Sequence, residues 1–371
     1  MTKNSVLIVA NDSKSILDFR WTLIEQCHEQ GWPVTIACNE DAYYSALKKK
    51  ASLYNNITVL PLNFANGGIN PLKDLALMVK MRRLYQELKP THVLLYRIKP
   101  VLYGSLAAYG LPVKVISTIT GLGYVYTDKS FKASLLRSIT NTLYKLSLRR
   151  NAWIFFQNAD DQQNLISLNL TTFNKSSVVG GSGIVLTDFP ETPLPESLSF
   201  IMVARLLKDK GIWEYLGAAA NLKKIYPHVN FKLIGGESSN PSAIALREIE
   251  NFCEKNNLIY LGYKNNILKD LQESSIFVLP SYREGMPRSA LEALSVGRPI
   301  ITTDTQGCRD LIRGNGLLVP IKDTVALQQA MQQLIELPEN LGQMATVSRH
   351  LAETVFDVKL VNAAVLDKLA L

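Results

Sequence analysis

The sequence has few cysteines and no long apolar run. Its four cysteines, at positions 27, 38, 253 and 308, show no metal-ligand spacing, which indicates reduced thiols in a cytoplasmic protein. No segment approaches the roughly 18–20 apolar residues of a membrane span. The first ten residues have too short an apolar core for a signal peptide, so we expect them to form a first strand.

Further absences restrict the cofactors. The chain has no Asp-x-Asp, the carboxylate pair that commonly holds Mn²⁺ or Mg²⁺ on a diphosphate, so we expect no metal and no other cofactor. No Gly-x-Gly-x-x-Gly follows a strand-like segment, which disfavours a nicotinamide-dependent dehydrogenase. The histidines, at positions 28, 92, 228 and 350, are expected to be structural or exposed.

Acidic residues are scarce in the first half. Residues 1–185 carry 21 Lys and Arg against 11 Asp and Glu, whereas residues 186–371 carry 19 against 21. The net charge of +8 therefore comes from the first half, which indicates an anionic partner there. No nucleic-acid-binding module accompanies the charge, and the aromatic residues are not spaced as a base-stacking platform. An anionic membrane surface is favoured over nucleic acid.

The sequence is rich in β-branched apolar runs that alternate with helical patterns. In the first half, we expect buried parallel strands at 6–10, 34–38, 58–62, 92–96, 113–118 and 152–157, with helices that include 15–30 and 71–88. In the second half, we expect strands at 199–203, 230–234, 259–261, 276–279 and 299–302, with helices at 211–225, 243–256, 267–273, 287–295 and 324–337. This alternation predicts doubly wound parallel sheets.

A length of 371 residues suits two such domains. We expect Rossmann-like domains at 1–188 and 199–354. Between them, the proline-rich segment 189–198 is expected to be a stiff linker that contains the hinge. Residues 355–371 are expected to form an amphipathic helix able to pack across either domain. Two domains of this kind would face a cleft at the carboxyl ends of their sheets, where such folds bind ligands.

Two glutamates, Glu284 and Glu292, stand in the segment Ser-Tyr-Arg-Glu-Gly-Met-Pro-Arg-Ser-Ala-Leu-Glu. Glu284 lies in a loop broken by Gly285 and Pro287, and Glu292 lies in the helix that follows. At ~1.5 Å per residue this spacing separates the carboxylates by roughly 10 Å, about the length of a sugar–diphosphate–ribose chain. The free N–H groups at the start of that helix can face a phosphate.

Arg205 and Lys210 follow the first strand of the second domain, in Val-Ala-Arg-Leu-Leu-Lys-Asp-Lys-Gly. Two cations in a strand-to-helix loop suit a diphosphate, whose charge they would neutralise as a sugar–phosphate bond breaks. Solvated loop cations are the plain alternative. On this segment alone the two interpretations weigh equally.

Together these motifs closely resemble the nucleotide-binding domain of family-4 retaining glycosyltransferases of the GT-B fold. The matching elements, in chain order, are Arg-x4-Lys-Gly, Gly235-Gly236, Gly262, Glu-x7-Glu and Gly-x-Pro. The resemblance is specific over residues 199–320 and mainly architectural over residues 1–190. Three segments, 117–124, 282–288 and 307–310, are similar to the branch that builds O-antigens, capsules and other polyprenyl-diphosphate-linked saccharides.

The resemblance implies a role for each matching residue. Arg205, Lys210 and Glu284 are the expected catalytic residues: the cations hold the diphosphate, and Glu284 faces the donor hexose. Glu292 is expected to accept hydrogen bonds from the ribose hydroxyls. The other expected donor-binding residues are Gly285, Met286, Pro287, Arg288, Gly235 and Tyr263.

The implied sites in the first domain are less distinctive. Many family members have a His in a loop that faces the donor sugar, where this chain has Thr-Ile-Thr-Gly-Leu-Gly; a tight strand-to-helix turn is the alternative for this loop. The residues expected to line an acceptor cleft are Asn11, Arg20, Arg97, Thr118, Thr120, Gly121 and Gly123.

Two basic amphipathic segments, 73–89 and 129–150, are candidates for contact with anionic lipid. A core-facing helix with a solvated basic face is the alternative. The cations of the second segment that are expected to face lipid are Lys132, Arg137, Lys145, Arg149 and Arg150.

The resemblance thus implies a retaining, metal-independent hexosyltransferase. It would move a hexose or N-acetylhexosamine from a nucleotide sugar, UDP-linked rather than GDP-linked, to a polyprenyl-diphosphate-linked saccharide in cell-surface glycan synthesis. Such an enzyme would bind peripherally to the inner face of the cell membrane. The alternatives are a GT-B enzyme with a soluble acceptor, a nucleotide-sugar epimerase, and a non-catalytic sugar-nucleotide-binding protein.

Overall fold

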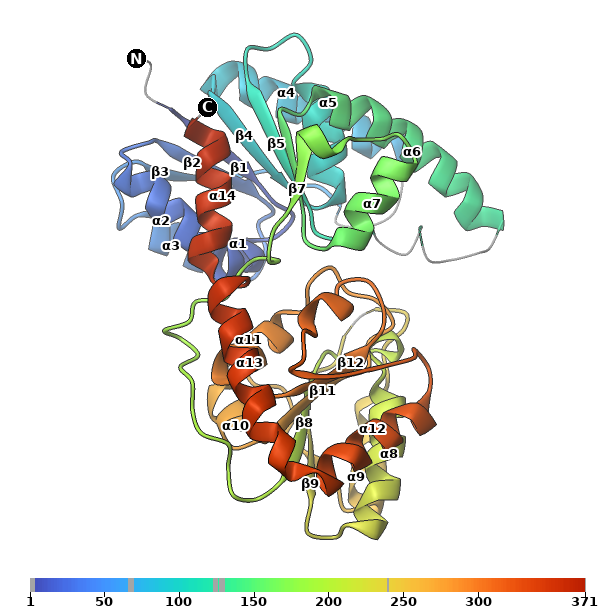
Figure 1. The fold of residues 1–371 in the computed structure, drawn as a ribbon. Helices are drawn as coiled ribbons and strands as arrows, with labels where there is room; N and C mark the ends of the chain where they lie inside the picture. Colours follow the sequence, from blue (N-terminus) through green and yellow to red (C-terminus); the bar gives the residue numbers. More distant parts are fainter. Residues whose placement is uncertain (1–3, 66–69, 123–125, 127–130, 239, 371) are drawn as a thin grey trace. The chain divides into compact units, whose positions relative to one another are not determined.

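The chain divides into two compact units (Figure 1). Unit 1 comprises Met1–Ser182 and Val361–Leu371, and unit 2 comprises Gly183–Leu360. The computed structural model describes residues 4–65, 70–122, 126, 131–238 and 240–370, without the side chains of 131–135.

Unit 1 is built on a seven-stranded parallel sheet of order β3-β2-β1-β4-β5-β6-β7. The strand order reverses between β1 and β4, which lie side by side although they are far apart in the sequence. The strands are β1 (Val6–Val9), β2 (Val34–Cys38), β3 (Ile57–Pro61), β4 (His92–Tyr96), β5 (Lys114–Ile119), β6 (Trp153–Phe156) and β7 (Ser176–Val178).

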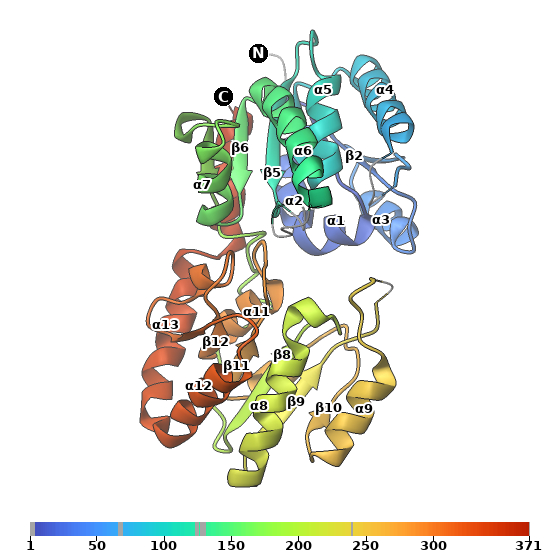
Figure 2. The ribbon, with the colours of Figure 1, turned by 90° about the vertical axis from the view of Figure 1, so that its right-hand side faces the viewer.

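Helices cover both faces of this sheet (Figures 1 and 2). The core on one face includes Ile24, Phe155 and Leu369, and its helices are α1 (Ser13–Phe19), α2 (Trp21–Glu29), α3 (Tyr44–Ala51) and α14 (Val358–Ala370). The core on the other face includes Met81 and Tyr144. Its helices are α4 (Pro71–Leu88), the π-helix η1 (Pro100–Gly104), α5 (Ser105–Ala107), α6 (Phe131–Arg150) and α7 (Ala159–Ser167), followed by the short η3 (Phe173–Lys175).

Unit 2 has a six-stranded parallel sheet of order β10-β9-β8-β11-β12-β13, which reverses between β8 and β11. Its strands are β8 (Ser199–Val203), β9 (Asn230–Ile234), β10 (Ile259–Tyr260), β11 (Ile276–Leu279), β12 (Ile300–Thr303) and β13 (Gly316–Val319). Its helices are η4 (Lys208–Lys210), α8 (Ile212–Ile225), α9 (Leu246–Lys255), α10 (Leu268–Gln272), α11 (Arg288–Val296), η5 (Arg309–Leu311), α12 (Thr324–Glu336), η6 (Pro338–Asn340) and α13 (Leu341–Thr354).

The predicted fold class is confirmed, since both units are doubly wound α/β structures. One predicted helix was wrong: residues 15–30 form two helices, α1 and α2, that meet at Arg20. The φ of Arg20 is −127°, outside the helical range, and its guanidinium lies 4.1 Å from the centroid of the Tyr96 ring. Tertiary packing of this side chain therefore overrides a continuous helical pattern.

The proline-rich segment 189–198, expected as an interdomain linker, lies within unit 2. Arg298 holds it there through a fully buried guanidinium. The guanidinium donates to the carbonyl oxygens of Thr192 and Pro193, both at 3.2 Å, and to that of Leu271 at 3.1 Å. One side chain thus fastens the segment to the body of unit 2.

Arg298→Lys is expected to destabilise unit 2 by roughly 2–4 kcal/mol, because an ammonium group cannot span carbonyls on two segments and is left poorly solvated. Burial already lowers the pKa of the Arg298 guanidinium to about 10. Urea unfolding followed by hydrogen exchange of unit 2 peptides measures the change. Arg313→Lys alters an exposed arginine of the same unit and is expected to leave the midpoint unchanged. Equal midpoints for both variants would contradict this role of Arg298.

Candidate active site

In unit 2, the carboxyl ends of β8 and β11 flank the point where the strand order reverses, the usual ligand crevice of a doubly wound sheet. The β8–α8 loop carries Arg205 and Lys210, and the β11–α11 loop carries Glu284. The two loops are joined directly, because the backbone N–H of Tyr282 donates to the carbonyl oxygen of Asp209 at 2.9 Å. The reversal thus places three residues that the sequence predicted for one site on two loops that are joined to one another.

Lys210 and Glu284 form a largely buried ion pair. The ammonium of Lys210 donates to Oε1 of Glu284, and the two side chains are only 15% and 13% exposed. Charges that are partly removed from water attract one another more strongly than exposed ones. Since each residue belongs to a different loop, this pair also fixes the two loops relative to one another.

The loop that follows β12 closes around Glu284. Gly307 has a φ of +73°, and a Cβ atom at this position would overlap the carbonyl oxygens of Glu284 and Gly285. The N–H of Glu284 donates to the carbonyl oxygen of Gln306 at 3.2 Å. Burial, and then the charge of Glu284, raise the pKa of the adjacent Cys308 thiol to about 12, so this thiol stays neutral. Gly307 therefore permits a backbone approach that holds Glu284 in place.

Tyr282 adds a further connection that the sequence did not predict. Its hydroxyl donates to Oε1 of Glu214, on α8, at 2.6 Å. Burial, and then this hydrogen bond, raise the pKa of Tyr282 well above its ordinary value. Lys322 lies over the same ring, with Nζ 5.1 Å from the centroid. The sequence signal was only the place of Tyr282 in the motif around Glu284, since its partners come from distant segments.

Glu292 lies inside α11, and its side chain is 12% exposed. Arg288, at the start of the same helix, donates from Nε to Oε1 of Glu292 at 2.8 Å. The buried Pro287 precedes the helix as its N-cap residue, and the half-buried Met286 packs against the core of unit 2. The carboxylate of Glu292 is therefore covered and oriented rather than freely solvated.

Arg205 and Tyr263 remain accessible beside this arrangement. Arg205 is exposed and makes no ion pair within the described residues. Gly235 has no room for a side chain, because a Cβ atom there would overlap the carbonyl oxygen of Ala204. Tyr263 is 61% exposed, and a Cβ atom on Gly236 would lie 3.1 Å from the Tyr263 side chain. An exposed cation and an exposed aromatic ring thus belong to loops that pack closely on the Gly235-Gly236 turn.

In unit 1, Asn11 follows β1 and Arg97 follows β4, at the reversal of that sheet. Asn11 is buried, whereas the side chain of Arg97 is 49% exposed and lies with Nη2 3.3 Å from Oδ2 of Asp12. Arg20 was expected in the same acceptor cleft, but it is 8% exposed and packed against Tyr96. Arg20 therefore supports this region from within.

The glycine-containing loop after β5 is only partly described. Thr118 lies near the carboxyl end of β5, beside Tyr96 of β4 in the sheet register, and is buried. Thr120 and Gly121 follow and are half-buried. Gly123 lies outside the described residues.

The cations expected to face lipid differ in their surroundings. Lys145 and Arg149 are exposed on α6, and Arg137 is half-buried. Arg150 donates to the carbonyl oxygens of Ala108, Leu111 and Val113, at 3.2, 2.9 and 2.7 Å. The side chain of Lys132 is not among those described. Arg150 thus fastens a loop within unit 1.

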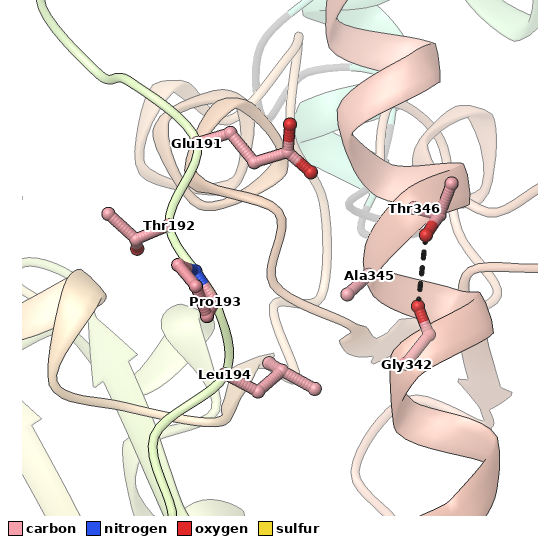
Figure 3. Close-up of a pocket in the computed structure, with 7 residues that line it drawn as sticks. All are labelled: Glu191, Thr192, Pro193, Leu194, Gly342, Ala345 and Thr346. Carbon is pink, nitrogen blue, oxygen red and sulfur yellow. Dashed lines mark hydrogen bonds between the residues drawn. The ribbon is translucent and has the colours of Figure 1, made fainter.

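A surface pocket of about 470 Å³ lies elsewhere in unit 2 (Figure 3). Its lining residues are Glu191, Thr192, Pro193, Leu194, Gly342, Ala345 and Thr346. It lies near the C-terminal end of α11, since a Cβ atom on Gly297 would be 3.5 Å from Cγ of Glu191. The loop that carries Glu284 leads into the opposite, N-terminal end of α11. No residue that the sequence predicted for the site lines this pocket.

Comparison with known families identifies the chain. Residues 186–350 match the family model described as glycosyl transferases group 1, and residues 5–158 match that described as glycosyl transferase 4-like. The chain belongs to the family-4 glycosyltransferases. The predicted enzyme class is therefore confirmed.

Individual relatives and one solved structure agree with this family. The N,N'-diacetylbacillosaminyl-diphospho-undecaprenol alpha-1,3-N-acetylgalactosaminyltransferase of Campylobacter jejuni is 29% identical over 339 residues, 87% of each chain. The UDP-Gal:alpha-D-GlcNAc-diphosphoundecaprenol alpha-1,3-galactosyltransferase of Escherichia coli is 26% identical over 285 residues, 72% of each. The structure of HepE from Anabaena in complex with UDP-glucose has a TM-score of 0.76 at 15% identity over 99% of each chain, which shows the shared GT-B fold.

Gly307→Ala is expected to lower the turnover of this glycosyltransferase by roughly 10- to 100-fold, because the added methyl group displaces the backbone of Glu284. Gly314→Ala is the matched control: Gly314 also has a positive φ, +90°, but no atom lies within 4 Å of its Cβ position. Both variants carry backbone strain of about 1 kcal/mol, and only the first disturbs the site. Steady-state transfer rates and thermal unfolding separate the two effects. Equal turnover in the two variants would refute the contact.

Proposed function

We propose that this chain transfers a hexose or N-acetylhexosamine from a UDP-sugar to a saccharide joined through a diphosphate to a polyprenyl lipid, in the synthesis of a cell-surface glycan. The observation that carries the proposal is the charge arrangement at the crevice of unit 2. Arg205 makes no ion pair within the described residues, and it shares the β8–α8 loop with Lys210, which pairs with Glu284. Relatives named for diphospho-undecaprenol acceptors, and the binding of UDP-glucose by HepE, support the choice of substrates.

The donor's diphosphate is assigned to Arg205 and Lys210. Because Glu284 already offsets the charge of Lys210, the exposed guanidinium of Arg205 supplies the excess positive charge that an anionic donor requires. The carboxylate of Glu284 accepts a hydrogen bond from a hydroxyl of the hexose. The carboxylate of Glu292 accepts hydrogen bonds from the hydroxyls of the ribose. The exposed ring of Tyr263 offers a face on which a nucleobase can stack.

The proposed reaction retains the anomeric configuration and does not use a metal ion. As the sugar–phosphate bond breaks, Arg205 and Lys210 stabilise the charge that develops on the departing diphosphate. That phosphate takes the proton of the accepting hydroxyl on the same face of the sugar. No protein nucleophile is needed, which suits a Glu284 carboxylate that is fixed by Lys210.

Lys210→Ala and Glu292→Ala are each expected to lower turnover about 100-fold and to leave the fold intact, because each removes a contact to the donor. The assay offers a panel of nucleotide sugars with a short polyprenyl-diphosphate monosaccharide in EDTA, and mass spectrometry identifies the products. Lys269→Ala, which removes an exposed lysine of α10, is the control. Near-normal activity of both site variants would refute the site. Epimerised donor without transfer would identify an epimerase instead.

Peripheral association with an anionic membrane is also part of the proposal. On α4, Leu72, Leu75 and Val79 recur at helical spacing and are 81%, 53% and 40% exposed. On α6, Ile139 and Leu146 are 47% and 50% exposed. Both helices lie on the same face of the sheet in unit 1, and no helix in the described ranges is long and apolar enough to cross a bilayer.

We call these apolar residues, with the exposed cations beside them, the α4–α6 surface. Its cations are Lys80, Arg83, Lys145 and Arg149. Exposed apolar side chains among basic residues are typical of helices that lie in the interface of an anionic bilayer. The basic residues attract the lipid headgroups, and the apolar residues can enter the boundary with the acyl chains.

Reversing the charge of Lys145 and Arg149 to Glu is expected to reduce retention on anionic liposomes at least about tenfold, since each basic residue near such a surface contributes about 1 kcal/mol. Co-sedimentation with liposomes of phosphatidylglycerol and phosphatidylcholine measures retention. Lys48→Glu with Lys49→Glu reverses two exposed charges on α3, which covers the other face of the sheet. Equal loss in both double variants, or no retention of the unaltered protein, would contradict the assignment of this surface.

A further inference from the structure

Tyr282 stands two residues before Glu284, and the main chain at this position is fastened on two sides. The N–H of Tyr282 donates to the carbonyl oxygen of Asp209, in η4, at 2.9 Å. Its carbonyl oxygen accepts from Oγ1 of Thr305, in the loop after β12, at 3.1 Å. The main chain that leads to Glu284 is therefore held by loops that follow two other strands.

The side chain of Tyr282 adds a connection to the start of α8. Its hydroxyl donates to Oε1 of Glu214, in the first turn of that helix, at 2.6 Å. The start of α8 packs on the end of β11, since a Cβ atom on Gly211 would overlap the carbonyl oxygen of Pro280. Nζ of Lys322, just before α12, lies 5.1 Å from the centroid of the ring, within the range of a cation–π contact. Both the hydroxyl and the ring of Tyr282 are thus held by other elements.

Stability alone is a poor explanation for the carboxylate of Glu214. The residue is half-buried, and its Oε2 is buried without a hydrogen-bond donor among the described residues. An oxygen in this state is costly, and an apolar side chain of similar size would avoid the cost. What Glu214 does provide is a charged acceptor, which binds a hydroxyl more strongly than a neutral acceptor does. The arrangement therefore favours the placement of Tyr282 over the stability of unit 2.

We propose that Tyr282, held by Glu214, is a positioning residue for sugar transfer. It fixes the main chain that carries Glu284 and so places the Glu284 carboxylate against the hexose of the donor. This role rests on the proposed function, which assigns the hexose to Glu284. Because UDP has no hexose, loss of the Tyr282 hydroxyl is expected to lower the rate of transfer without weakening the binding of UDP.

Tyr282→Phe is expected to lower kcat about tenfold and to leave the Kd of UDP within about twofold of the unaltered value, because only the hydroxyl is lost. The donor that the panel of nucleotide sugars identifies is used for kcat, and calorimetry with UDP gives Kd. Tyr226→Phe is the matched control, since the Tyr226 hydroxyl also donates to a glutamate oxygen, Oε1 of Glu336, at 2.6 Å, but at the C-terminal end of α8. An unchanged kcat in Tyr282→Phe, an equal loss in Tyr226→Phe, or an equal loss of UDP affinity would overturn the role.

Two substitutions of Glu214 separate positioning from folding. Glu214→Gln keeps an acceptor oxygen for the Tyr282 hydroxyl, and kcat is expected to stay within about threefold of the unaltered value. Glu214→Met removes this acceptor together with the unpartnered oxygen, so we expect an unchanged thermal midpoint and a kcat about tenfold lower. Combining Glu214→Met with Tyr282→Phe is expected to add no further loss, since both remove the same bond. Equal kcat in the Gln and Met variants would contradict the positioning role.

Glu284→Ala distinguishes a failure of this role from a failure of the proposed function. Normal turnover in Glu284→Ala would reject the assignment of the hexose to Glu284. A large loss in Glu284→Ala with normal turnover in Tyr282→Phe would reject the positioning role alone. Amide hydrogen exchange of the peptide 281–290 needs no donor, and we expect faster exchange in Tyr282→Phe than in Tyr226→Phe. Equal exchange in these two variants would also reject the role.

Discussion

In unit 2, the ion pair between Lys210 and Glu284 joins the loops that follow β8 and β11, and the rest of the site is arranged around it. The loop after β12 packs on the backbone of Glu284 through Gly307. The N–H of Tyr282 and the carbonyl of Asp209 add a second connection between the same two loops. Without the pair, each loop would carry a poorly solvated charge, and burial of an unpaired charge is costly. The pair therefore sets both the position of the loops and the charge available to a ligand.

Unit 1 repeats this arrangement with the charges exchanged. There the carboxylate, Asp12, follows the first strand and the cation, Arg97, follows the strand across the reversal; in unit 2 the cation follows the first strand. The degree of burial distinguishes the two pairs. The covered contact of Lys210 is suited to fixing loops, whereas the half-exposed contact of Arg97 leaves a guanidinium that can bind a further anion. Position at the reversal brings such residues together, and burial decides how they can be used.

The sequence predicted the strands and helices to within about three residues in most cases, because buried parallel strands are continuous apolar runs. It did not predict β7 or β13, which are short and include Ser176, Ser177 and Gly316. The break at Arg20 was also missed, since it depends on packing against Tyr96. For the site, the motif indicated Lys210 and Glu284, but not their pairing across 74 residues. Partners from distant segments are set by the sheet topology, which local periodicity does not contain.

The basic character of unit 1 illustrates the same limit. A count from the sequence treats every cation alike, whereas the structure separates cations that are hydrogen-bonded within unit 1 from cations that are exposed. Arg150 donates to three carbonyl oxygens, Arg82 to those of Ala107 and Tyr109, and Lys99 is buried against Asp74. These charges still add to the field that attracts an anionic surface at long range, because a field depends on charge and not on hydrogen-bond partners. Contact with lipid requires exposed side chains, which leaves the cations of the α4–α6 surface and the apolar residues between them to hold the protein after attraction has brought it close.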